Sequence, residues 1–408
     1  MQNSYKEGPD TEKTAETTRS LTVSILSLSL LTVMAGAAVA PALGVIEKYF
    51  AGENRLLVQM IISVPALFIF ITNLLFPLMC RHIKSKPLVM AGLALYIIGG
   101  CAAGLFSSIY AVLAARAVVG IGVGIIMPLS TGLISYYFPR GRQEEMMGWS
   151  SAMNQLGGVT ATLIAGALAS VSWRLSFLVY LMGLISCVLC AAFLPSDMIG
   201  EAEREDRDPG QSGSGPASQS PAKAYARYIA AMFFLMLTFF IYPSNFAIET
   251  TADGIIPQAL ISVIMAAMDL VAFCGGLSFV RIKARIGGAS RLCAPLMFFT
   301  GYALMAFAGG WAGTLAGSFL VGFANGLGIP YIISAASQKA GRAAAATAIP
   351  LISAALYLAQ FVTPAISSAV SALFTAAGLP HPAYITAMLS ALIFLIISLP
   401  DDERREIR

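Results

Sequence analysis

Two charged residues stand inside long apolar runs of this sequence. Arg116 opens the stretch RAVVGIGVGIIMP (116–128), and Asp269 lies in VIMAAMDLVAFCGG (263–276). A charge in lipid hydrocarbon costs on the order of a few kcal/mol, so each side chain must face protein or water. A buried carboxylate can bind and release a proton, and a nearby arginine can bias that exchange or hold an anion. The pair predicts proton coupling or anion binding, with Asp269 as the preferred proton site.

Both residues have a second interpretation. Arg116 lies roughly 9 Å inside its apolar run at 1.5 Å per residue, so its side chain could instead reach the headgroups. A neighbouring helix could neutralise Asp269 and leave it a packing role. We expect Arg116 to face a central cavity.

The surroundings of these charges are those of a membrane protein. The 408 residues are 57% apolar and 11% charged, with a mean hydropathy of +0.78, whereas soluble domains have roughly twice that charged fraction. Continuous apolar runs of about 20 residues are long enough to cross a bilayer as helices. About twelve such runs follow one another, near 21–46, 56–79, 88–108, 110–138, 146–171, 175–194, 226–248, 257–280, 292–310, 312–334, 344–370 and 382–399.

Basic residues set the expected orientation. Lys48, Arg55 and Arg174 fall on one side of the twelve spans, and all other Lys and Arg except Arg116 fall on the side that bears both termini. The positive-inside rule places that side in the cytoplasm. We expect a multi-pass protein of the inner or plasma membrane, in contact with lipid and not with nucleic acid.

The chain divides into two similar halves. A polar segment rich in Gly, Ser and Pro predicts a flexible linker. Gly120, Gly124 and Pro128 recur 202 positions later as Gly322, Gly326 and Pro330, and Arg116 is matched by Ser318. The expected organisation is a cytoplasmic tail (1–19), a six-helix bundle (20–195), the linker (196–224), a second six-helix bundle (225–399) and a tail (400–408).

Further pairs repeat at nearly the same spacing. Pro41 and Glu47 match Pro243 and Glu249, Gln155 matches Gln360, and the basic loops at Arg81 and Arg281 correspond. Asp269 has no acidic counterpart, because the offset lands on Leu67. Copies with an even number of spans have the same orientation, and the substrate site of such parallel repeats lies between them.

These features resemble the major facilitator superfamily of secondary transporters over residues 20–399. The similarity rests on the two six-span halves, the long linker, the pattern R-x-x-x-G-x-G-x-G at 116–124 and the segment SWRLSF (172–177), which is similar to the drug-exporting branches. The resemblance implies an all-α protein of about twelve helices and ties Arg116 to proton transfer. Cys80 and Val280 stand where the family has an acidic residue linked to its conformational change, and the fifth span lacks the antiporter proline.

Polar side chains on the expected cavity-facing spans are candidate substrate contacts, although each could also be a hydrogen bond between helices. We rank Gln155 and Gln360 first because both halves contain them. The other candidates are Asn73, Asn154, Tyr242, Asn245, Asn325 and Tyr357. Gly120, Gly124, Gly322 and Gly326 predict close helix contacts. We add Pro41 and Pro243 as helix bends, Arg81 and Arg281 as gating residues, and Glu47 and Glu249 as either gate residues or solvated helix ends.

The sequence offers little for other chemistry. Its two histidines, His82 and His381, have no metal-ligand spacing around them, and no phosphate-binding loop is present. We expect no enzyme activity, metal or cofactor. The leading hypothesis is proton-coupled efflux of small hydrophobic or amphipathic compounds by a monomer. The alternatives are import of a small organic anion held by Arg116, and a membrane sensor or assembly protein that does not transport.

Overall fold

The computed structural model describes residues 9–197, 225–254, 256–308 and 310–399. It describes their side chains except at 9–18, 81, 140, 141, 144 and 337–350. Most of the predicted linker and all of the predicted C-terminal tail lie outside the described residues. The described residues are helical almost throughout, and helix α1 already begins at Pro9, within the predicted N-terminal tail.

Each half is a run of helices joined by short turns. The first half contains α1 (Pro9–Ala37), η1 (Ala40–Ala42), α2 (Leu43–Tyr49), α3 (Arg55–His82), α4 (Ser85–Ala103), α5 (Ile109–Tyr137), α6 (Arg140–Ala169), α7 (Trp173–Ser176), η2 (Phe177–Met182) and α8 (Gly183–Phe193). The second contains α11 (Ala226–Asp253), α12 (Gln258–Ile286), η3 (Gly287–Ala289), α13 (Ser290–Ala303), η4 (Leu304–Ala308), α14 (Gly310–Ala376) and α15 (Pro382–Ser398).

The helices agree with the twelve predicted spans. Nine stretches of the described chain are long and apolar enough to cross a membrane, and one of them, Gln258–Ala308, contains two predicted spans. The other two predicted spans are α6, which begins with the polar residues RGRQEE, and the 17-residue α15. The expectation of an all-α protein with about twelve helices is confirmed.

One boundary differs from the prediction. The sequence suggested separate spans at 312–334 and 344–370, whereas the structure has one helical element, α14, of 67 residues. Within it, Gly310–Ala336 and Leu351–Ala376 are separate span candidates. The segment between them contains AAAATA and no proline before Pro350. Alanine is the strongest helix former, and Gly341 alone does not end the helix there.

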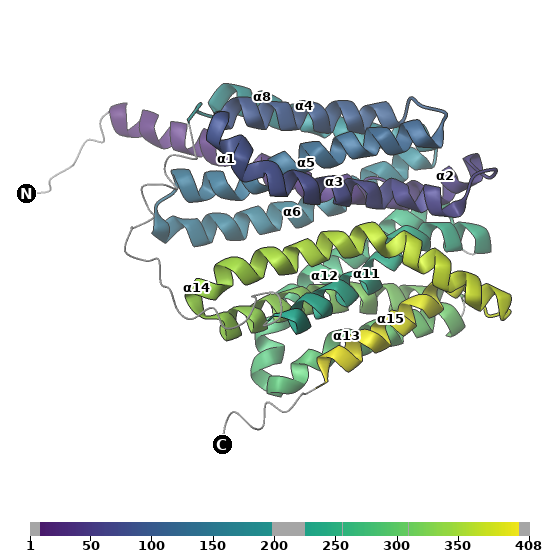
Figure 1. Cartoon of the computed structure of the whole chain (residues 1–408). Helices are drawn as coiled ribbons and strands as arrows, with labels where there is room; N and C mark the ends of the chain where they lie inside the picture. Colours follow the sequence, from purple (N-terminus) through teal and green to yellow (C-terminus); the bar gives the residue numbers. More distant parts are fainter. Residues whose placement is uncertain (1–8, 198–224, 255, 309, 400–408) are drawn as a thin grey trace, which may run out of the picture.

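The two halves lie side by side. Figure 1 shows the first half, purple to teal, above the second half, green to yellow. Helix α3 contacts α14, α6 contacts α12, and α2 contacts α11 across the boundary. We call the end where α8 stops and α11 starts the linker end, on the left of Figure 1, and the opposite end, which contains α2, the Glu249 end.

Glycines on α5 and α14 allow the equivalent close contact in both halves. An added Cβ at Gly120 would overlap the Pro65 carbonyl of α3, and one at Gly322 would overlap the Met268 carbonyl of α12. Gly124 and Gly326 repeat these contacts one turn further along the same helices. The glycines predicted for packing therefore bring helix backbones together where no other residue fits.

Arg116 lies one turn before Gly120 and is completely buried. Its Nε–H donates to the Ile61 carbonyl at 2.7 Å, and its Nη2–H donates to the Ala35 carbonyl at 2.5 Å. Its Nη1–H donates to the hydroxyl of Tyr180, which itself donates to the Ala35 carbonyl at 2.8 Å. Arg116 therefore joins α5 to α1, α3 and η2.

Both carbonyls that accept from Arg116 lack their normal helix partner. Ile61 would accept from the N–H of residue 65, but Pro65 has none. Ala35 would accept from Val39, but that N–H bonds Gly36 at 3.3 Å, where α1 gives way to the short helix η1. Arg116 thus satisfies two buried acceptors that helix breaks expose, and unsatisfied acceptors of this kind cost about 1–3 kcal/mol each.

The second half lacks breaks at the equivalent positions. Helix α12 contains no proline, and α11 is continuous from Ala226 to Asp253, with Pro243 inside it. At the position of Arg116 stands Ser318, which donates to the Thr314 carbonyl at 2.7 Å and accepts from Tyr242 at 2.9 Å. The buried arginine thus stands beside the freed Ile61 and Ala35 carbonyls of the first half, and Ser318 stands at its position in the second.

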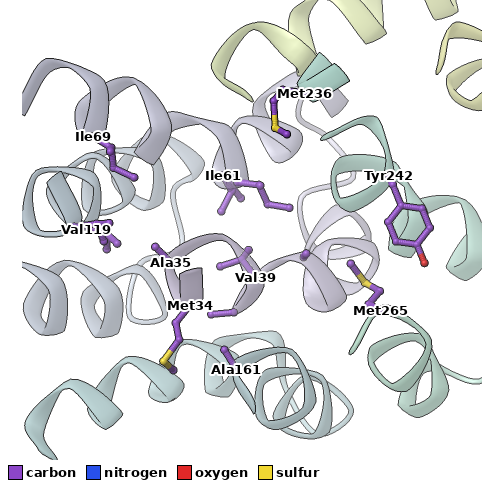
Figure 2. Packing of buried hydrophobic residues seen from close by; sticks show 14 of the residues in the cluster. Met34, Ala35, Val39, Ile61, Ile69, Val119, Ala161, Met236, Tyr242 and Met265 are labelled. Carbon is purple, nitrogen blue, oxygen red and sulfur yellow. The ribbon is translucent and has the colours of Figure 1, made fainter. Parts of the chain in front are cut away.

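Buried hydrophobic residues complete the fold on both sides of the boundary. Ala35, Val39, Ile61 and Val119 belong to one core cluster with Met265 of the second half. Figure 2 shows these side chains with α1 and α3 around them. The apolar contacts surround the Arg116 hydrogen bonds and keep them away from water.

Gly326→Ala is predicted to destabilise the protein, because its Cβ would overlap the backbone carbonyl of Ala272. The expected loss is about 1–3 kcal/mol, as for other overpacked sites. The thermal unfolding midpoint in detergent measures it. Gly132→Ala on α5 is the control, since an added Cβ there meets nothing within 4 Å. Equal midpoints for the two variants would contradict the packing role.

Arg116→Lys is predicted to lower the unfolding midpoint even though the charge is kept. Lysine cannot reach two carbonyls and a hydroxyl with a planar fork, so at least one acceptor stays unsatisfied, at about 1–3 kcal/mol. Tyr180→Phe should have a smaller effect of the same sign, and Arg142→Lys, on an exposed arginine, should have none. An unchanged midpoint for Arg116→Lys would show that the carbonyls do not need it.

Candidate functional site

A cavity of ≈ 290 Å³ lies between the two halves. Residues from α1, α3, α5 and α6 line one side, and residues from α11, α12 and α14 line the other. The lining is mainly apolar and includes Ile62, Ile69, Phe239, Phe240 and Met265. The cavity is placed where a duplicated transporter is expected to bind its substrate.

Asp269 is the one charged residue among the residues described as lining this cavity. It projects from the middle of α12, next to the Met268 carbonyl that Gly322 contacts. Its carboxyl group has no hydrogen-bond or ion-pair partner within the described part of the chain. An acidic group in a mostly apolar cavity is therefore free to meet a proton or a cationic ligand.

Five of the predicted substrate contacts also line the cavity. Gln155 and Gln360, one from each half, face it without a hydrogen-bond partner in the described residues, and so does Asn325, whose Oδ1 is buried and unpaired. Asn154 accepts a hydrogen bond from Thr32, and Tyr357 donates to the Met127 Sδ at 2.7 Å across the two halves. The cavity thus offers three unpaired amides.

The other three predicted contacts lie elsewhere. Tyr242 is fully buried and its hydroxyl donates to Ser318. Asn73 does not line the cavity, and its buried Oδ1 has no hydrogen-bond partner in the described residues. Asn245 accepts from the Gln59 Nε2 at 2.6 Å, closer to the Glu249 end. Their placement follows from helix rotation, which the polar residue type alone does not reveal.

Arg116 also differs from the expectation that it faces the cavity. It is 0% exposed and absent from the cavity lining, and its donors point to the Ile61 and Ala35 carbonyls and to Tyr180. The two unshared charges therefore occupy different environments. Arg116 lies inside the first bundle, and Asp269 lies between the bundles.

The predicted bends and gating residues are distributed along the molecule. Pro41 lies in the 3₁₀ segment η1, and its carbonyl accepts from the Gln258 Nε2 at 2.9 Å. Pro243 stays inside the continuous helix α11 and lines the cavity. Arg281 is exposed near the linker end, and the side chain of Arg81 lies outside the described residues.

A charged cluster joins the halves at the Glu249 end. The Arg55 Nη2 lies 2.5 Å from the Glu249 Oε1, and its Nε lies 3.5 Å from the Glu47 Oε1. The His381 Nδ1 lies 3.3 Å from the other Glu249 oxygen. We call Glu47, Arg55, Glu249 and His381 the end cluster. The repeat predicted the two glutamates, but no local pattern marked Arg55 or His381 as their partners.

Cross-half contacts near this cluster close the Glu249 end. Gln59 bonds Asn245, Gln258 bonds Pro41, and Gly166 fits against the side chain of Ser262. The end cluster and these contacts lie between the cavity and this end of the molecule. Access to the cavity from that side would require them to separate.

At the linker end, an acidic residue lies near the connection between α3 and α4, where Cys80 stands in place of the acidic residue of the family pattern. Asp197 accepts from the Tyr137 hydroxyl at 2.6 Å, and its carbonyl accepts from the Ser85 N–H at 2.9 Å. The carboxylate near this loop therefore comes from the end of the first half and not from position 80. No group of three or more His, Cys, Asp or Glu residues in the described chain could hold a metal ion.

Comparison with known proteins agrees with this architecture. The sequence matches the Major Facilitator Superfamily over residues 25–364. An uncharacterized MFS-type transporter, Rv1250 of Mycobacterium tuberculosis (strain ATCC 25618 / H37Rv), is 29% identical over 113 residues, which are 27% of this chain and 20% of that protein. The matched part is thus about a fifth of that relative's length.

Solved transporters share the fold at low sequence identity. A bacterial homologue of the human lysosomal transporter Spinster, in an inward-facing and unoccupied conformation, has a TM-score of 0.70 and 15% identity, with 94% of this chain and 95% of that chain covered. A mutant of the nucleoside transporter NupG gives 0.73 and 13%, with 93% and 98% covered. A D-xylose–proton symporter gives 0.69 and 14%, with 94% and 98% covered.

The names of these transporters give different substrates. At identities of 13–15%, the similarity establishes the fold and not the substrate. The family match extends over most of the chain, and the described helices form the two expected bundles around a central cavity. The protein belongs to the Major Facilitator Superfamily.

Proposed function

We propose that this transporter exports small hydrophobic or amphipathic compounds in exchange for protons, and that Asp269 binds the proton. The observation behind the proposal is an unpaired carboxyl group in a mainly apolar cavity between the halves. A proton and an amphipathic compound with a positive charge would compete for this one acid. Competition for a single site is the simplest way to couple two opposite fluxes.

The cavity lining supports this class of substrate. Phe239, Phe240 and Met265 offer apolar and polarisable surface, and Gln155 and Gln360 offer amide hydrogen bonds from opposite halves. Phosphorylated substrates would need several basic residues, and the lining described has none. Sugars would need a denser set of polar groups.

The rival functions fit the structure less well. An importer of organic anions would need Arg116 in the cavity, but its donors are already bonded to Ile61, Ala35 and Tyr180. A sensor that does not transport would need no partnerless acid at the centre of a cavity. We further propose an inner or plasma membrane location, a monomer, and cytoplasmic termini at the linker end, following the distribution of basic residues.

The proposal predicts that Asp269→Asn abolishes proton-driven transport. Asparagine cannot take up and release a proton, so uptake of amphipathic fluorescent dyes by inverted membrane vesicles should fall at least about tenfold when a pH gradient is imposed. Asp253→Asn, which changes an exposed acid at the Glu249 end, should transport as the unchanged protein does. Gradient-driven uptake that survives in Asp269→Asn would refute the coupling role.

Removal of a charge from the end cluster is expected to increase access to the cavity from the Glu249 end. In a background with the six native cysteines replaced by serine, Gln360→Cys reports access to the cavity. Arg55→Ala removes the ion pair with Glu249 across the halves and the ion pair with Glu47 within the first half. Because Arg55 is 44% exposed, the pairs are worth about 1 kcal/mol or less, so labelling from the Glu249 side should rise by up to about fivefold.

The control for this experiment is Lys48→Ala, which removes an exposed positive charge at the same end. It should leave the labelling rate unchanged. Equal rates for Arg55→Ala and Lys48→Ala would contradict a role for the end cluster in closure. Labelling of position 360 from one side only, in every variant, would support a protein that does not alternate.

A further inference from the structure

A second, smaller cavity of ≈ 60 Å³ lies inside the C-terminal half at the linker end. Residues from α11, α13, α14 and α15 surround it, and it shares no lining residue with the central cavity. Two arginines line it, Arg227 at the start of α11 and Arg291 at the start of α13. The lining residues described include no Asp or Glu.

The two arginines differ in their hydrogen bonds. Arg227 Nε–H donates to the Ile397 carbonyl at 2.9 Å, and its Nη2–H donates to the Leu399 carbonyl, so Arg227 is fixed against the end of α15. The Nε of Arg291 is shielded from solvent and has no hydrogen-bond partner in the described structure. A buried charged donor without an acceptor is costly, so an acceptor bound in this cavity would stabilise the fold.

The remaining lining has two kinds of surface. Ser290 and Ser398 belong to the same lining as the arginines, and the Ser290 hydroxyl donates to the Gly287 carbonyl at 2.7 Å, whereas Leu327, Ile332 and Phe394 are apolar. A guanidinium fork suits a phosphate, and the adjoining apolar surface suits a hydrocarbon chain. Basic pockets between membrane helices recognise lipid headgroups by this combination.

We propose that this cavity binds the phosphate of an anionic glycerophospholipid, with Arg291 donating to the phosphate and the acyl chains following the apolar side. The site lies at the end of the spans that the basic residues place toward the cytoplasm, where the headgroup layer would be. A bound lipid would join α11, α13, α14 and α15 at their shared end. The site is separate from substrate transport and does not depend on Asp269.

Lipid binding to the purified, delipidated full chain tests the proposal. Phosphatidylglycerol should remain bound in native mass spectrometry and raise the thermal unfolding midpoint, whereas phosphatidylcholine should do neither. Arg291→Gln should weaken phosphatidylglycerol binding by about fivefold or more, the effect of one basic group near a headgroup. Arg285→Gln, an exposed arginine at the end of α12 outside the cavity lining, is the matched control and should bind normally.

A second variant keeps the test valid if Arg291→Gln folds poorly. Ser398→Glu adds a negative charge to the lining and leaves both arginines in place, so it should weaken phosphatidylglycerol binding. Because Ser398 is partly exposed at the end of α15, the midpoint measured without lipid should change little. Equal binding by Arg291→Gln and Arg285→Gln would overturn the proposal, and so would equal retention of phosphatidylcholine. Displacement of the lipid by millimolar inorganic phosphate alone would show a site for soluble phosphate and overturn the lipid assignment.

Discussion

The hydrogen bonds of one buried arginine join three helical elements of the first half of this protein to α5. Arg116 donates to carbonyls of α1 and α3 that have lost their helix partners, one beside the break after α1 and one four residues before Pro65. An ion in a membrane interior is costly, but unpaired carbonyls are costly there too. The guanidinium group and the two carbonyls satisfy each other by hydrogen bonding, and the apolar core around them keeps water away.

The position of Arg116 also explains how the halves can be alike and yet differ. The same helix face presents Arg116, Gly120 and Gly124 to α3, and its copy presents Gly322 and Gly326 to α12, where no proline interrupts the helix. Close backbone packing is therefore common to both halves, whereas the buried arginine is found in the first half, beside the carbonyls of Ile61 and Ala35. The broken helix α1 and the acid of α12 both border the same cavity.

Contacts within a half differ in kind from those between halves. Inside a half, helices meet through glycines and fully buried side chains, which leave little freedom to move. At the Glu249 end, the halves also meet through partly exposed charges, which water can replace at low cost, beside the buried Gln59–Asn245 hydrogen bond. A molecule built this way is expected to move at its central boundary and to keep each bundle intact.

The sequence predicted those features that depend on residue type and spacing. Span positions follow from long apolar runs, the glycine contacts follow from repeated small residues, and the position of Asp269 away from lipid follows from the cost of a charge in mid-span. Rotation of a helix about its axis has no comparable signal, so Tyr242, Asn245 and Asn73 were predicted to face the cavity and do not line it. Arg116 was predicted to face the cavity and does not. Its partners include main-chain carbonyls, whose availability cannot be read from residue types. Arg55 and His381 reach Glu249 through the tertiary fold, and their sequence separations of 194 and 132 residues show no pattern.

The most direct test of the central claim is a count of protons released when substrate binds. Purified protein in weakly buffered detergent solution, near neutral pH, is mixed with a transported amphipathic dye while a pH indicator is followed. If Asp269 exchanges a proton for substrate, dye binding releases protons from the unchanged protein and releases none from Asp269→Asn. Binding of the dye to the unchanged protein without proton release would contradict the account.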